Sequence, residues 1–433
     1  MDIPDIALKI LARLPLKSIA RFRSVKKEWK FLIDSDYFRD YFISLNSSSS
    51  TSWSIVQIKP HKLTLDIVSH HGCKVLGLTR PPGSLVSFFL ETKIRQVLVL
   101  ACTDGLVLIY AKSSNGTLMY YIGNPLLQEW FRIPLPSYII QMDLGKNSEH
   151  FKDVGLVTEI KSGMVVSYKI VVLVAYSAQF EFMIYSSDSG IWELRNVACR
   201  HRFSLGFIQR KSIALNGILH WLYTCMLTSF IVAYNFYGGY NDGVDNDKCR
   251  SIGFPGSGKN ERFKRTFTTS EGFIVYLNEF YGNENRTLRV WRLVKYTDVV
   301  AEAWQLFWEV NLVSLMKLGI DYFPVVMHPL NSEIIYLWSR NKKSLILYNL
   351  RTHLFSLHKE FEVDSKCMDG CVLSFNDCSK YMETIYEYIS SVQGGPSHLL
   401  FSQYVLPRWL HRLPPPPPQP SNDYIAVLRC YIR

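Results

Sequence analysis

The chain has 433 residues, of which 48% are hydrophobic and 20% are charged. This balance is typical of a folded globular protein and excludes an intrinsically disordered chain. Lys and Arg number 48 against 37 Asp and Glu, and the resulting net charge of +11 favours acidic partners without indicating a fold. The length exceeds that of one ordinary compact domain, so we expect a small module joined to a large one.

The sequence does not indicate secretion or membrane insertion. Asp2 and Asp5 near the N-terminus, without a long apolar run, exclude a secretory signal. The best apolar run, residues 170–176, is too short to span a bilayer. Nine cysteines, an odd number, are scattered without a dense framework, which indicates reduced thiols. We therefore expect an intracellular protein, in the nucleus, the cytoplasm or both.

Residues 3–45 have the pattern of a compact run of short helices. Apolar residues recur at four-residue steps at Ile6, Ile10 and Leu14, which predicts an amphipathic helix. Pro4 suits the first turn of this helix, where the missing N–H costs nothing.

Pro15 is expected to end the first helix, because proline has no N–H to donate and disfavours helix at the preceding residue. A second short helix is expected over residues 17–22. Ser24 is the expected N-cap of a third helix, which carries Val25, Trp29, Leu32 and Ile33.

Two features of this helical segment point to a partner. So few residues bury only a marginal core, and short amphipathic helices therefore need something else to pack against. Lys26 and Lys27 lie in the first turn of the third helix, where the helix dipole prefers acidic residues. Together with Arg21, Arg23 and Lys30 they favour a docking face for an acidic partner over a solvated basic surface.

The order of these residues resembles the F-box of plant F-box proteins. Ile3 replaces the usual leucine before Pro4, and Ser24 stands where cysteine is common. The resemblance implies docking on the small acidic Skp-family linker subunit of an SCF ubiquitin ligase, and through it on the cullin. The matching residues are Ile3-Pro4, Leu14-Pro15, Lys17-Ser18, Arg21 to Arg23, Val25, Lys27, Trp29, Leu32-Ile33 and Ser35.

On this basis we predict which residues dock on the linker subunit. The hydrophobic ones are to be buried against it, and the lysines steer the encounter with its acidic surface. The predicted docking residues are Ile3, Pro4, Ile6, Ile10, Leu11, Leu14, Pro15, Leu16, Val25, Lys27 and Trp29.

A polar segment, residues 46–52, reads as a flexible linker, and beyond it the periodicity changes to short alternating strands. The 25 Tyr, 25 Phe and 10 Trp suit such strands. A module of two or three strands recurs roughly every fifty to sixty residues, near the kelch period for propeller blades. Five copies are legible, and their leading strands begin near Gly105, Tyr168, Gly217, Gly272 and Glu333.

Two copies agree in spacing residue for residue. Tyr185 precedes Trp192 by seven residues, as Tyr348 precedes Phe355. A turn of fixed length between strands of fixed register would produce this spacing. The segments 53–95 and 370–406 could complete further modules, so the number of blades stays open.

The same segments resemble the F-box-associated domain of many plant proteins over about residues 95–360. The resemblance implies a kelch-like propeller that presents substrates, with an enlarged loop at 238–264. We thus expect an α+β multidomain chain: an all-α F-box (1–45), a Ser-rich linker (46–52), an all-β, β-propeller-like domain (53–406) and a Pro-rich tail (407–433). The matching pieces are Gly123-Asn124-Pro125, Glu129-Trp130, Leu135-Pro136, Tyr185 to Trp192, Leu215-Asn216-Gly217, Leu219-His220-Trp221 and Tyr348 to Thr352.

The tail contains the run PPPPPQP, which predicts a polyproline II segment. Recognition of this segment by a partner is one interpretation. A stiff extension that takes no part in the fold is the one we favour.

Catalytic and metal-binding patterns are weak. Residues 253–259 have phosphate-loop spacing, but Asn260 lacks the hydroxyl that ligates magnesium, and residues 248–251 do not read as a buried strand. Cys367, Cys371 and Cys378 lack a histidine pair nearby and read as structural thiols. His220 lies inside an apolar strand and reads as a core residue. We expect no catalytic residue, cofactor or metal.

Basic clusters at 200–202, 259–265, 286–292 and 340–343 invite a nucleic-acid interpretation. The aromatic residues near them alternate with the period of two of a strand, as core residues do, so we favour solvated loop charge. The resemblance implies a substrate adaptor for ubiquitination that binds an unknown target protein. The alternatives are a basic propeller that binds RNA or another polyanion, and an F-box sensor of a small ligand.

Overall fold

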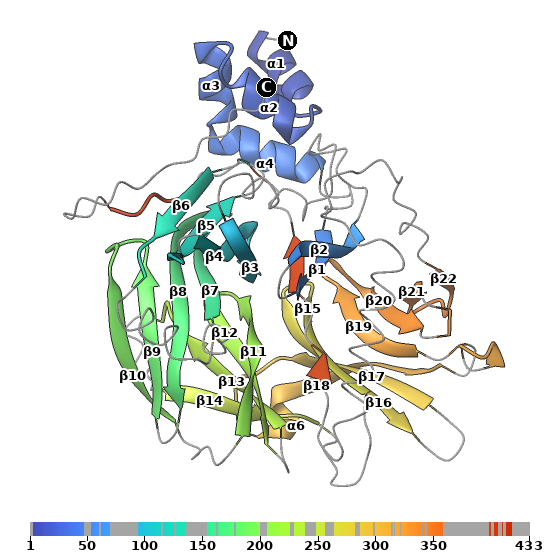
Figure 1. The fold of residues 1–433 in the computed structure, drawn as a ribbon. Coiled ribbons are helices and arrows are strands. Elements are labelled where there is room, and N and C mark those ends of the chain that lie inside the picture. Colours follow the sequence, from blue (N-terminus) through green and yellow to red (C-terminus); the bar gives the residue numbers. More distant parts are fainter. Residues whose placement is uncertain are drawn as a thin grey trace.

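The structure is a computed structural model. It describes residues 3–46, 53–59, 62–69, 94–113, 116–124, 127, 129–135, 154–161, 163–176, 179–199, 206–225, 229–238, 248–255, 264–281, 286–297, 299–312, 315, 317–320, 322–339, 341–342, 344–357, 398–399, 402–405, 409 and 413–417. Within these ranges a helical unit lies against the rim of a ring of sheets (Figure 1).

The helical unit consists of α1 (Ile3–Leu11), α2 (Leu16–Phe22), α3 (Lys27–Ile33) and α4 (Asp36–Leu45). Pro15 separates α1 from α2 and is the N-cap of α2, with the extended ψ of 145° that excludes it from a helix. The predicted N-cap of α3 is wrong: Lys26 occupies that position, and the Ser24 hydroxyl instead donates to the Arg21 carbonyl at 2.7 Å.

Helix α4 was not predicted. The sequence feature that marks its start is Ser35, the N-cap. The Ser35 hydroxyl accepts a hydrogen bond from the Phe38 N–H at 3.2 Å, as a serine N-cap usually does. Phe38 and Phe42 lie four residues apart on the buried face of this helix. The helical unit therefore has four helices, one more than the sequence pattern suggested.

The strands form antiparallel meanders of four consecutive strands. Their arrangement around a common centre is that of a β-propeller (Figure 1). The first two are β3 (Ile94–Thr103), β4 (Leu106–Ser113), β5 (Leu118–Asn124) and β6 (Glu129–Ile133), then β7 (Val154–Lys161), β8 (Met164–Tyr176), β9 (Gln179–Ser186) and β10 (Trp192–Cys199).

Three further meanders continue the ring, and a short helix, α6 (Val300–Ala303), connects two strands of the second of them. Their strands are β11 (Gly206–Leu215), β12 (Ile218–Cys225), β13 (Ser229–Asn235) and β14 (Lys248–Gly253), then β15 (Lys264–Ser270), β16 (Phe273–Tyr281), β17 (Arg286–Leu293) and β18 (Trp304–Asn311), then β19 (Tyr322–His328), β20 (Asn331–Ser339), β21 (Ser344–Asn349) and β22 (Phe355–Leu357).

A sixth sheet closes the ring. It joins β1 (Trp53–Lys59) and β2 (Lys62–Ser69) to β24 (Ser402–Val405), so strands from opposite ends of the chain share one sheet. β23 (His398–Leu399) pairs in parallel with β15. Gln403 of β24 donates to the carbonyls of Thr269 (2.9 Å) and Met327 (2.8 Å) on two other sheets. The suggestion that residues beyond the five legible modules complete another blade is thus confirmed for 53–69 and 402–405.

The first strand of each meander was missed by the sequence analysis. β3, β7 and β11 lie side by side, as do β15 and β19. In β15 the buried residues include Thr266 and Ser270, whose hydroxyls donate to the Val325 and His328 carbonyls at 3.0 and 2.7 Å. Strand β15 thus buries hydroxyls that connect neighbouring sheets, so it lacks the apolar signature of a core strand.

Several turns from the first to the second strand of a meander use two residues at positive φ, as a type I′ hairpin requires. In two of these turns the first residue also contacts the next meander. The Thr158 hydroxyl donates to Asp104, and the Ser332 N–H donates to Glu271 at 3.0 Å. The turns are Asp104-Gly105, Asn216-Gly217 and Glu271-Gly272.

The seven-residue spacing predicted to mark one repeated turn is confirmed. Trp192 pairs with Tyr185 across β9 and β10, and Phe355 pairs with Tyr348 across β21 and β22. Trp130 pairs with Gly123 at the same separation, and a Cβ at Gly123 would overlap the indole ring. Gly123 is therefore required by the close approach of Trp130.

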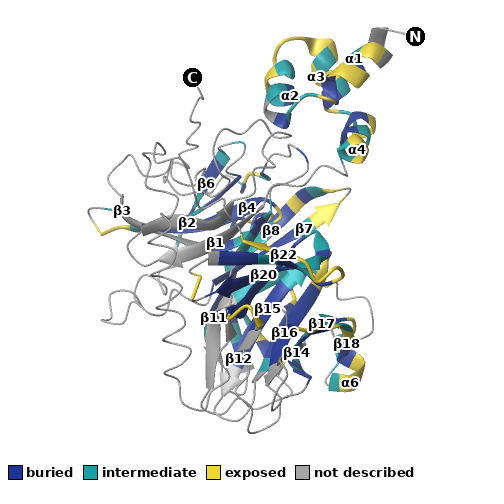
Figure 2. Ribbon diagram, turned by 90° about the vertical axis from the view of Figure 1, so that its right-hand side faces the viewer, coloured by how far each residue is buried: buried dark blue, intermediate teal, exposed yellow. Residues whose placement is uncertain are grey.

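Burial is distributed unequally between the two parts (Figure 2). The meanders bury most of their large apolar side chains among themselves, whereas the core of the helical unit is completed by residues from elsewhere. That core contains Leu8, Leu11, Ala12, Leu16, Ile19, Ile33, Phe38 and Phe42 of the helices together with Val107, Ile109, Ala111, Trp130, Tyr404 and Trp409.

The interpretation of the Pro-rich tail as an extension that takes no part in the fold is wrong for its described residues. Trp409 is buried with α4, and Leu413 is buried in the cluster between the first two meanders. Pro417 packs on Gly190 in the turn between β9 and β10. The tail was misread because its few apolar residues show no period and its prolines suggested a linker.

Candidate partner-docking surface

The predicted docking residues separate into three groups in the structure. Ile6, Ile10, Val25 and Lys27 are exposed, whereas Leu14, Pro15 and Trp29 are half-buried and Leu11 and Leu16 are buried. Ile3 and Pro4 belong to α1, and their side chains lie outside the described residues.

Helix α1 has two apolar stripes, and only one of them faces the core. Leu8, Leu11 and Ala12 are buried in the cluster shared with the ring, while Ile10 is 57% exposed. Of the predicted stripe, Ile6 and Ile10 face outward, whereas Leu14 lies beyond the end of α1 and packs against the shared core. Leu11 and Leu16 are held inside the chain, so we leave both out of the docking surface.

Phe31 is the docking candidate that the sequence analysis missed. It lies in the middle of α3 and is 76% exposed. Phe31 lies two residues after Trp29 and therefore falls outside the inward-facing stripe of the helix. An apolar residue at such a position is the sequence signal that could have identified it. Trp29 itself turns inward, with its ring edge-on to Phe22 at 5.2 Å.

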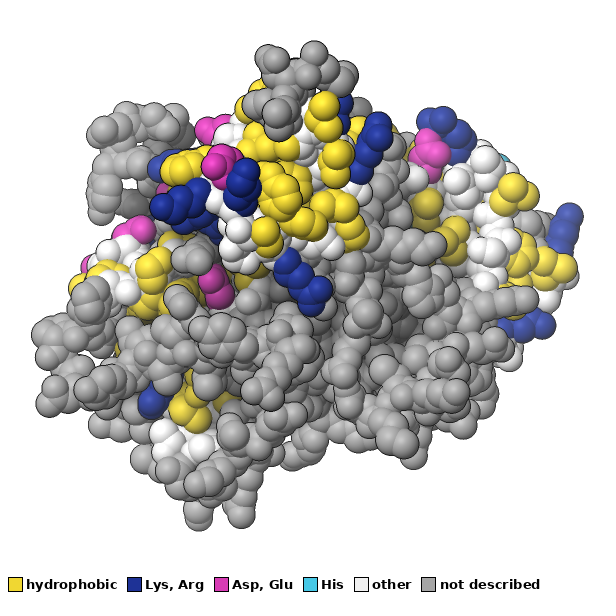
Figure 3. Space-filling model, turned by 90° about the horizontal axis from the view of Figure 1, so that it is seen from above, with side chains coloured by type: hydrophobic (Ala, Val, Ile, Leu, Met, Phe, Trp, Pro, Cys, Tyr) yellow, Lys and Arg dark blue, Asp and Glu magenta, His cyan; other side chains and the backbone are white. Residues whose placement is uncertain are grey.

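The candidate docking surface consists of Ile6, Ile10, Val25 and Phe31, which are among the exposed apolar side chains of the helical unit. Seen from above, the molecule shows a group of hydrophobic side chains beside Lys and Arg (Figure 3). Exposed apolar residues that cluster in this way mark interaction sites more often than scattered ones do.

The charge around the docking surface is basic. Residues 3–46 contain nine Lys and Arg against five Asp and Glu. Arg23 is held by Asp34, with Nη2 to Oδ2 at 3.1 Å, whereas the pair of Lys26 and Glu28 is exposed and 3.6 Å apart. The exposed cations are Lys9, Arg13, Arg21, Lys26, Lys27 and Lys30.

The start of α3 combines two unfavourable features next to this surface. Lys26 is its N-cap and supplies no side-chain hydrogen bond, and Lys27 follows in the first turn. Both choices oppose the preference of helix N-termini for acceptors and negative charge. A local departure of this kind is expected where function, not folding, selects the residue.

Within the ring of meanders, His220 has a structural role. It is fully buried, with Nδ1 3.0 Å from the Ile213 carbonyl and Nε2 2.8 Å from the Tyr296 hydroxyl. Burial lowers the pKa of His220 to about 4, against a smaller opposing effect of the Ile213 carbonyl. The ring is neutral near pH 7, which agrees with its interpretation as a core residue.

A second polar cluster joins the meanders β7–β10 and β11–β14. Lys169 donates to the Phe236 carbonyl at 2.6 Å and lies 4.3 Å from the Tyr237 ring centre, while Ser167 donates to Asp188 at 2.9 Å. Burial, and next the charge of Arg195, lowers the pKa of Lys169, and burial raises that of Tyr237. These groups satisfy one another, so the cluster is an internal connection.

Two arginines of the basic cluster at 286–292 are already paired. Arg289 donates to Glu309 at 2.9 Å, and Arg292 donates to Glu271 at 3.0 Å. The guanidinium of Arg292 also lies 3.4 Å from the centre of the Phe307 ring. Such arginines connect strands and offer little charge to a polyanion.

Other candidate motifs lie partly beyond the described ranges. Residues 248–251 belong to strand β14 with Cys249 buried, so the expectation that they form no buried strand is wrong. Lys259 and Asn260, and the cysteines at 367, 371 and 378, lie outside the described residues. Within the described ranges, no cluster of three or more His, Cys, Asp and Glu is placed to hold a metal ion. Nor does a described helix have the length and apolar character to cross a membrane.

The helical docking unit and the ring of meanders define the class as an F-box protein with a β-propeller. Residues 2–41 match the F-box domain model, and residues 51–415 match the model "F-box protein At3g26010-like, beta-propeller". The chain therefore belongs to this family of F-box β-propeller proteins.

Relatives in Arabidopsis thaliana agree over nearly their whole length. One named "Putative F-box protein At3g23950" is 64% identical, with 97% of this chain and 99% of that protein covered. "F-box protein At3g26010" is 33% identical over 97% and 92% of the two chains. A relative whose name includes "F-box/kelch-repeat protein At1g15680" is 34% identical, with 96% of each chain covered.

Proposed function

We propose that this protein is the substrate-recognition subunit of an SCF-type ubiquitin ligase. Its F-box docks on a Skp-family linker subunit, which joins it to the cullin, and its propeller binds a target protein. The protein acts inside the cell, in the nucleus, the cytoplasm or both. The observation that carries the proposal is the exposed apolar surface of Ile6, Ile10, Val25 and Phe31 on an F-box whose inner stripe is already buried.

The chemistry of this surface fits an acidic partner with an apolar groove. The apolar residues supply the contact area that is removed from water, and the surrounding cations steer the encounter. Lys26 and Lys27 at the start of α3 place positive charge where α3 itself gains nothing from it. An acidic linker subunit would restore that balance in the complex.

The propeller contributes recognition, and no covalent step is assigned to this chain. Ubiquitin transfer belongs to the enzyme that the cullin brings. Holding the target on the same assembly raises its effective concentration near that enzyme. The protein therefore works by tethering.

Binding to a purified plant Skp-family subunit tests the docking surface. Replacement of Leu14 by Asp is the change that the sequence first suggests, but Leu14 is half-buried against the shared core and its loss would disturb the fold. Ile10→Asp is cleaner because the side chain is exposed. We expect binding to weaken by about 2 kcal/mol or more, roughly thirtyfold, as at an interface hot spot.

Leu354→Asp is the matched control, since Leu354 is 70% exposed on the turn before β22 and is remote from the F-box. It should leave binding unchanged. Calorimetry of both variants with the linker subunit gives the comparison. If Ile10→Asp bound as tightly as the wild type, the proposed docking surface would be wrong.

A further inference from the structure

Trp409 fills the contact between the F-box and the propeller. Only 7% of its surface is exposed, and its ring centre lies 5.8 Å from that of Phe38 and 5.3 Å from that of Phe42, both on α4. The same apolar cluster contains Val107 and Trp130 of the first meander. A residue from the far end of the chain is therefore built into the core that holds α4 on the ring.

The segment around Trp409 is fixed on the side that precedes it. Tyr404 of β24 pairs with Ser54 of β1 and is buried in the same cluster as Trp409. Because β24 also closes the ring through Gln403, the strand that completes the propeller leads directly into the contact with the F-box.

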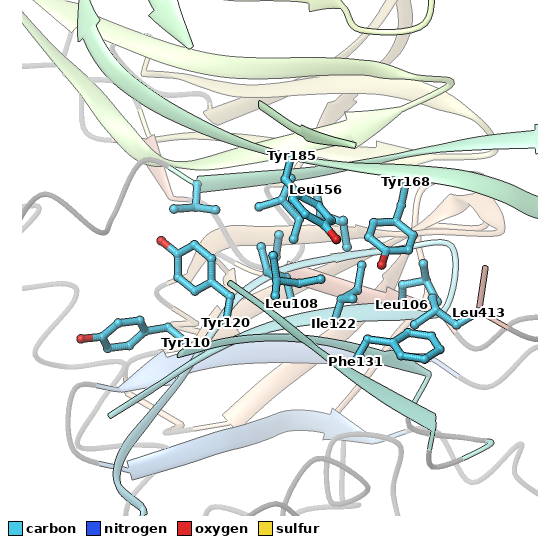
Figure 4. Close-up of a cluster of buried hydrophobic side chains, with 14 of the residues drawn as sticks. Leu106, Leu108, Tyr110, Tyr120, Ile122, Phe131, Leu156, Tyr168, Tyr185 and Leu413 are labelled. Atoms are coloured by element: carbon cyan, nitrogen blue, oxygen red, sulfur yellow. The ribbon is translucent and has the colours of Figure 1, made fainter. Parts of the chain in front are cut away.

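The segment is fixed again on the side that follows it. Leu413 is buried at one end of the cluster beside Leu106 and Phe131 (Figure 4). Its N–H donates to Glu129 at 3.4 Å, and Pro417 packs on Gly190. The prolines between these contacts restrict the backbone, so the segment loses little entropy in this path. We call residues 402–405, 409 and 413–417 the C-terminal strap.

We propose that Trp409 is a positioning residue for ubiquitin transfer: through it, the C-terminal strap locks the F-box in one orientation on the propeller. This inference rests on the proposed function. The linker subunit holds one face of the F-box and the propeller holds the target, so the angle between F-box and propeller sets where the target lies relative to the ubiquitin-loaded enzyme.

The physical requirement is geometric. Transfer to a lysine needs the amine close to the ubiquitin thioester, and small misplacements of reacting groups cost much of the rate. If the F-box were joined to the propeller through residues 46–52 alone, the target would be distributed over many positions. Its effective concentration at any one position would then be lower. A buried tryptophan between two phenylalanines of α4 removes that freedom.

The test compares three full-length variants in the reconstituted ligase. Trp409→Ala empties the contact, and Trp409→Phe keeps an aromatic ring there. Trp304→Ala is the control, because Trp304 is 4% exposed in the core beside β16 and lies outside the cluster that contains the F-box. Should Trp409→Ala fail to fold, Phe42→Leu loosens the same contact from the α4 side with a smaller loss of volume.

Three measurements are made on each variant: affinity for the purified Skp-family subunit, hydrogen exchange of the α4 amides, and the map of lysines on this chain that become ubiquitinated. For Trp409→Ala we expect unchanged affinity, several-fold faster exchange in α4, and a broadened lysine map in which the preferred lysines lose rate. Trp409→Phe should restore the exchange rates and the map, and Trp304→Ala should alter neither.

The inference is overturned if Trp409→Ala keeps the wild-type lysine map, or if Trp304→Ala broadens the map equally, which would indicate general destabilisation. Failure of the proposed function gives a different result, since the wild-type chain would then not bind the Skp-family subunit at all. The hydrogen-exchange comparison needs no ligase, and unchanged exchange in α4 of Trp409→Ala would contradict the locking contact by itself.

Discussion

The F-box and the meander β19–β22 bury their apolar residues in opposite ways. In the meander, Ile335, Leu337 and Ile346 are completely buried in a cluster formed with the preceding meander. The F-box takes Trp409 and residues of the first meander to complete its core, yet it leaves Ile10 and Phe31 in solvent. The buried apolar residues of the meander thus serve folding, whereas some of those in the F-box are exposed and available to a partner.

A matched pair of substitutions gives the largest expected contrast. Ile346→Ala removes a fully buried side chain and leaves a cavity, so the free energy of unfolding should fall by about 2–5 kcal/mol. Ile10→Ala removes the same atoms from an exposed position and should change stability by less than about 0.5 kcal/mol. Guanidinium unfolding followed by tryptophan fluorescence measures both.

Binding to the linker subunit should show the reverse order, with Ile10→Ala weakened and Ile346→Ala unchanged while it remains folded. Equal losses of stability for the two variants would show that Ile10 supports the fold, and the distinction between the two regions would fail.

The pattern of the meanders could be read from the sequence because their second to fourth strands repeat a local signal. The spacing from Tyr185 to Trp192 and from Tyr348 to Phe355 is set by the length of one turn, so it survives in the order of residues. Among the first strands of the meanders, β15 was missed because Thr266 and Ser270 connect sheets through hydroxyls. Their partners are about sixty residues away, and no local pattern encodes them.

The candidate docking surface could be predicted only in part, and the reason for the incomplete prediction is related. A helical stripe locates apolar residues on α1 but does not say which of two stripes faces inward, and Leu11 was therefore grouped with Ile10. The direction depends on the ring and on Trp409, both distant in sequence. The turn from Pro15 into α2 is local and was predicted, whereas the contact of the tail with α4 is not local and was missed.

Protonation of histidine at low pH should lower the stability of the propeller but not that of the F-box. Residues 3–46 contain no histidine, whereas His220 is fully buried in the meander β11–β14. Its pKa is about 4 when folded, below the 6.5 of an exposed imidazole, so only the unfolded chain takes up the proton as the pH falls. Stability from this group is complete above pH 6.5 and declines as the pH falls toward 4.

The expected loss between pH 7 and pH 5 is about 2 kcal/mol from His220 alone. Unfolding by denaturant at a series of pH values measures it. His220→Asn should be less stable at pH 7 but lose this part of the pH dependence, since asparagine does not titrate. A variant with the full wild-type slope would assign the acid sensitivity to other groups.

The smallest expected effect tests why α3 starts poorly while α4 starts well. Ser35 caps α4 with a hydrogen bond, whereas Lys26 gives α3 none. Lys26→Ser should supply the missing acceptor and slow hydrogen exchange in α3 by the equivalent of about 0.5–1 kcal/mol. It should also slow association with the acidic linker subunit, most clearly at low salt, because one steering charge is lost.

Lys161→Ser is the control, since Lys161 also forms an exposed pair, with Glu159, but lies on β7 and should change neither quantity. A Lys26→Ser variant that gained stability and associated as fast as the wild type would mean that this lysine is a tolerated defect of the helix and takes no part in docking.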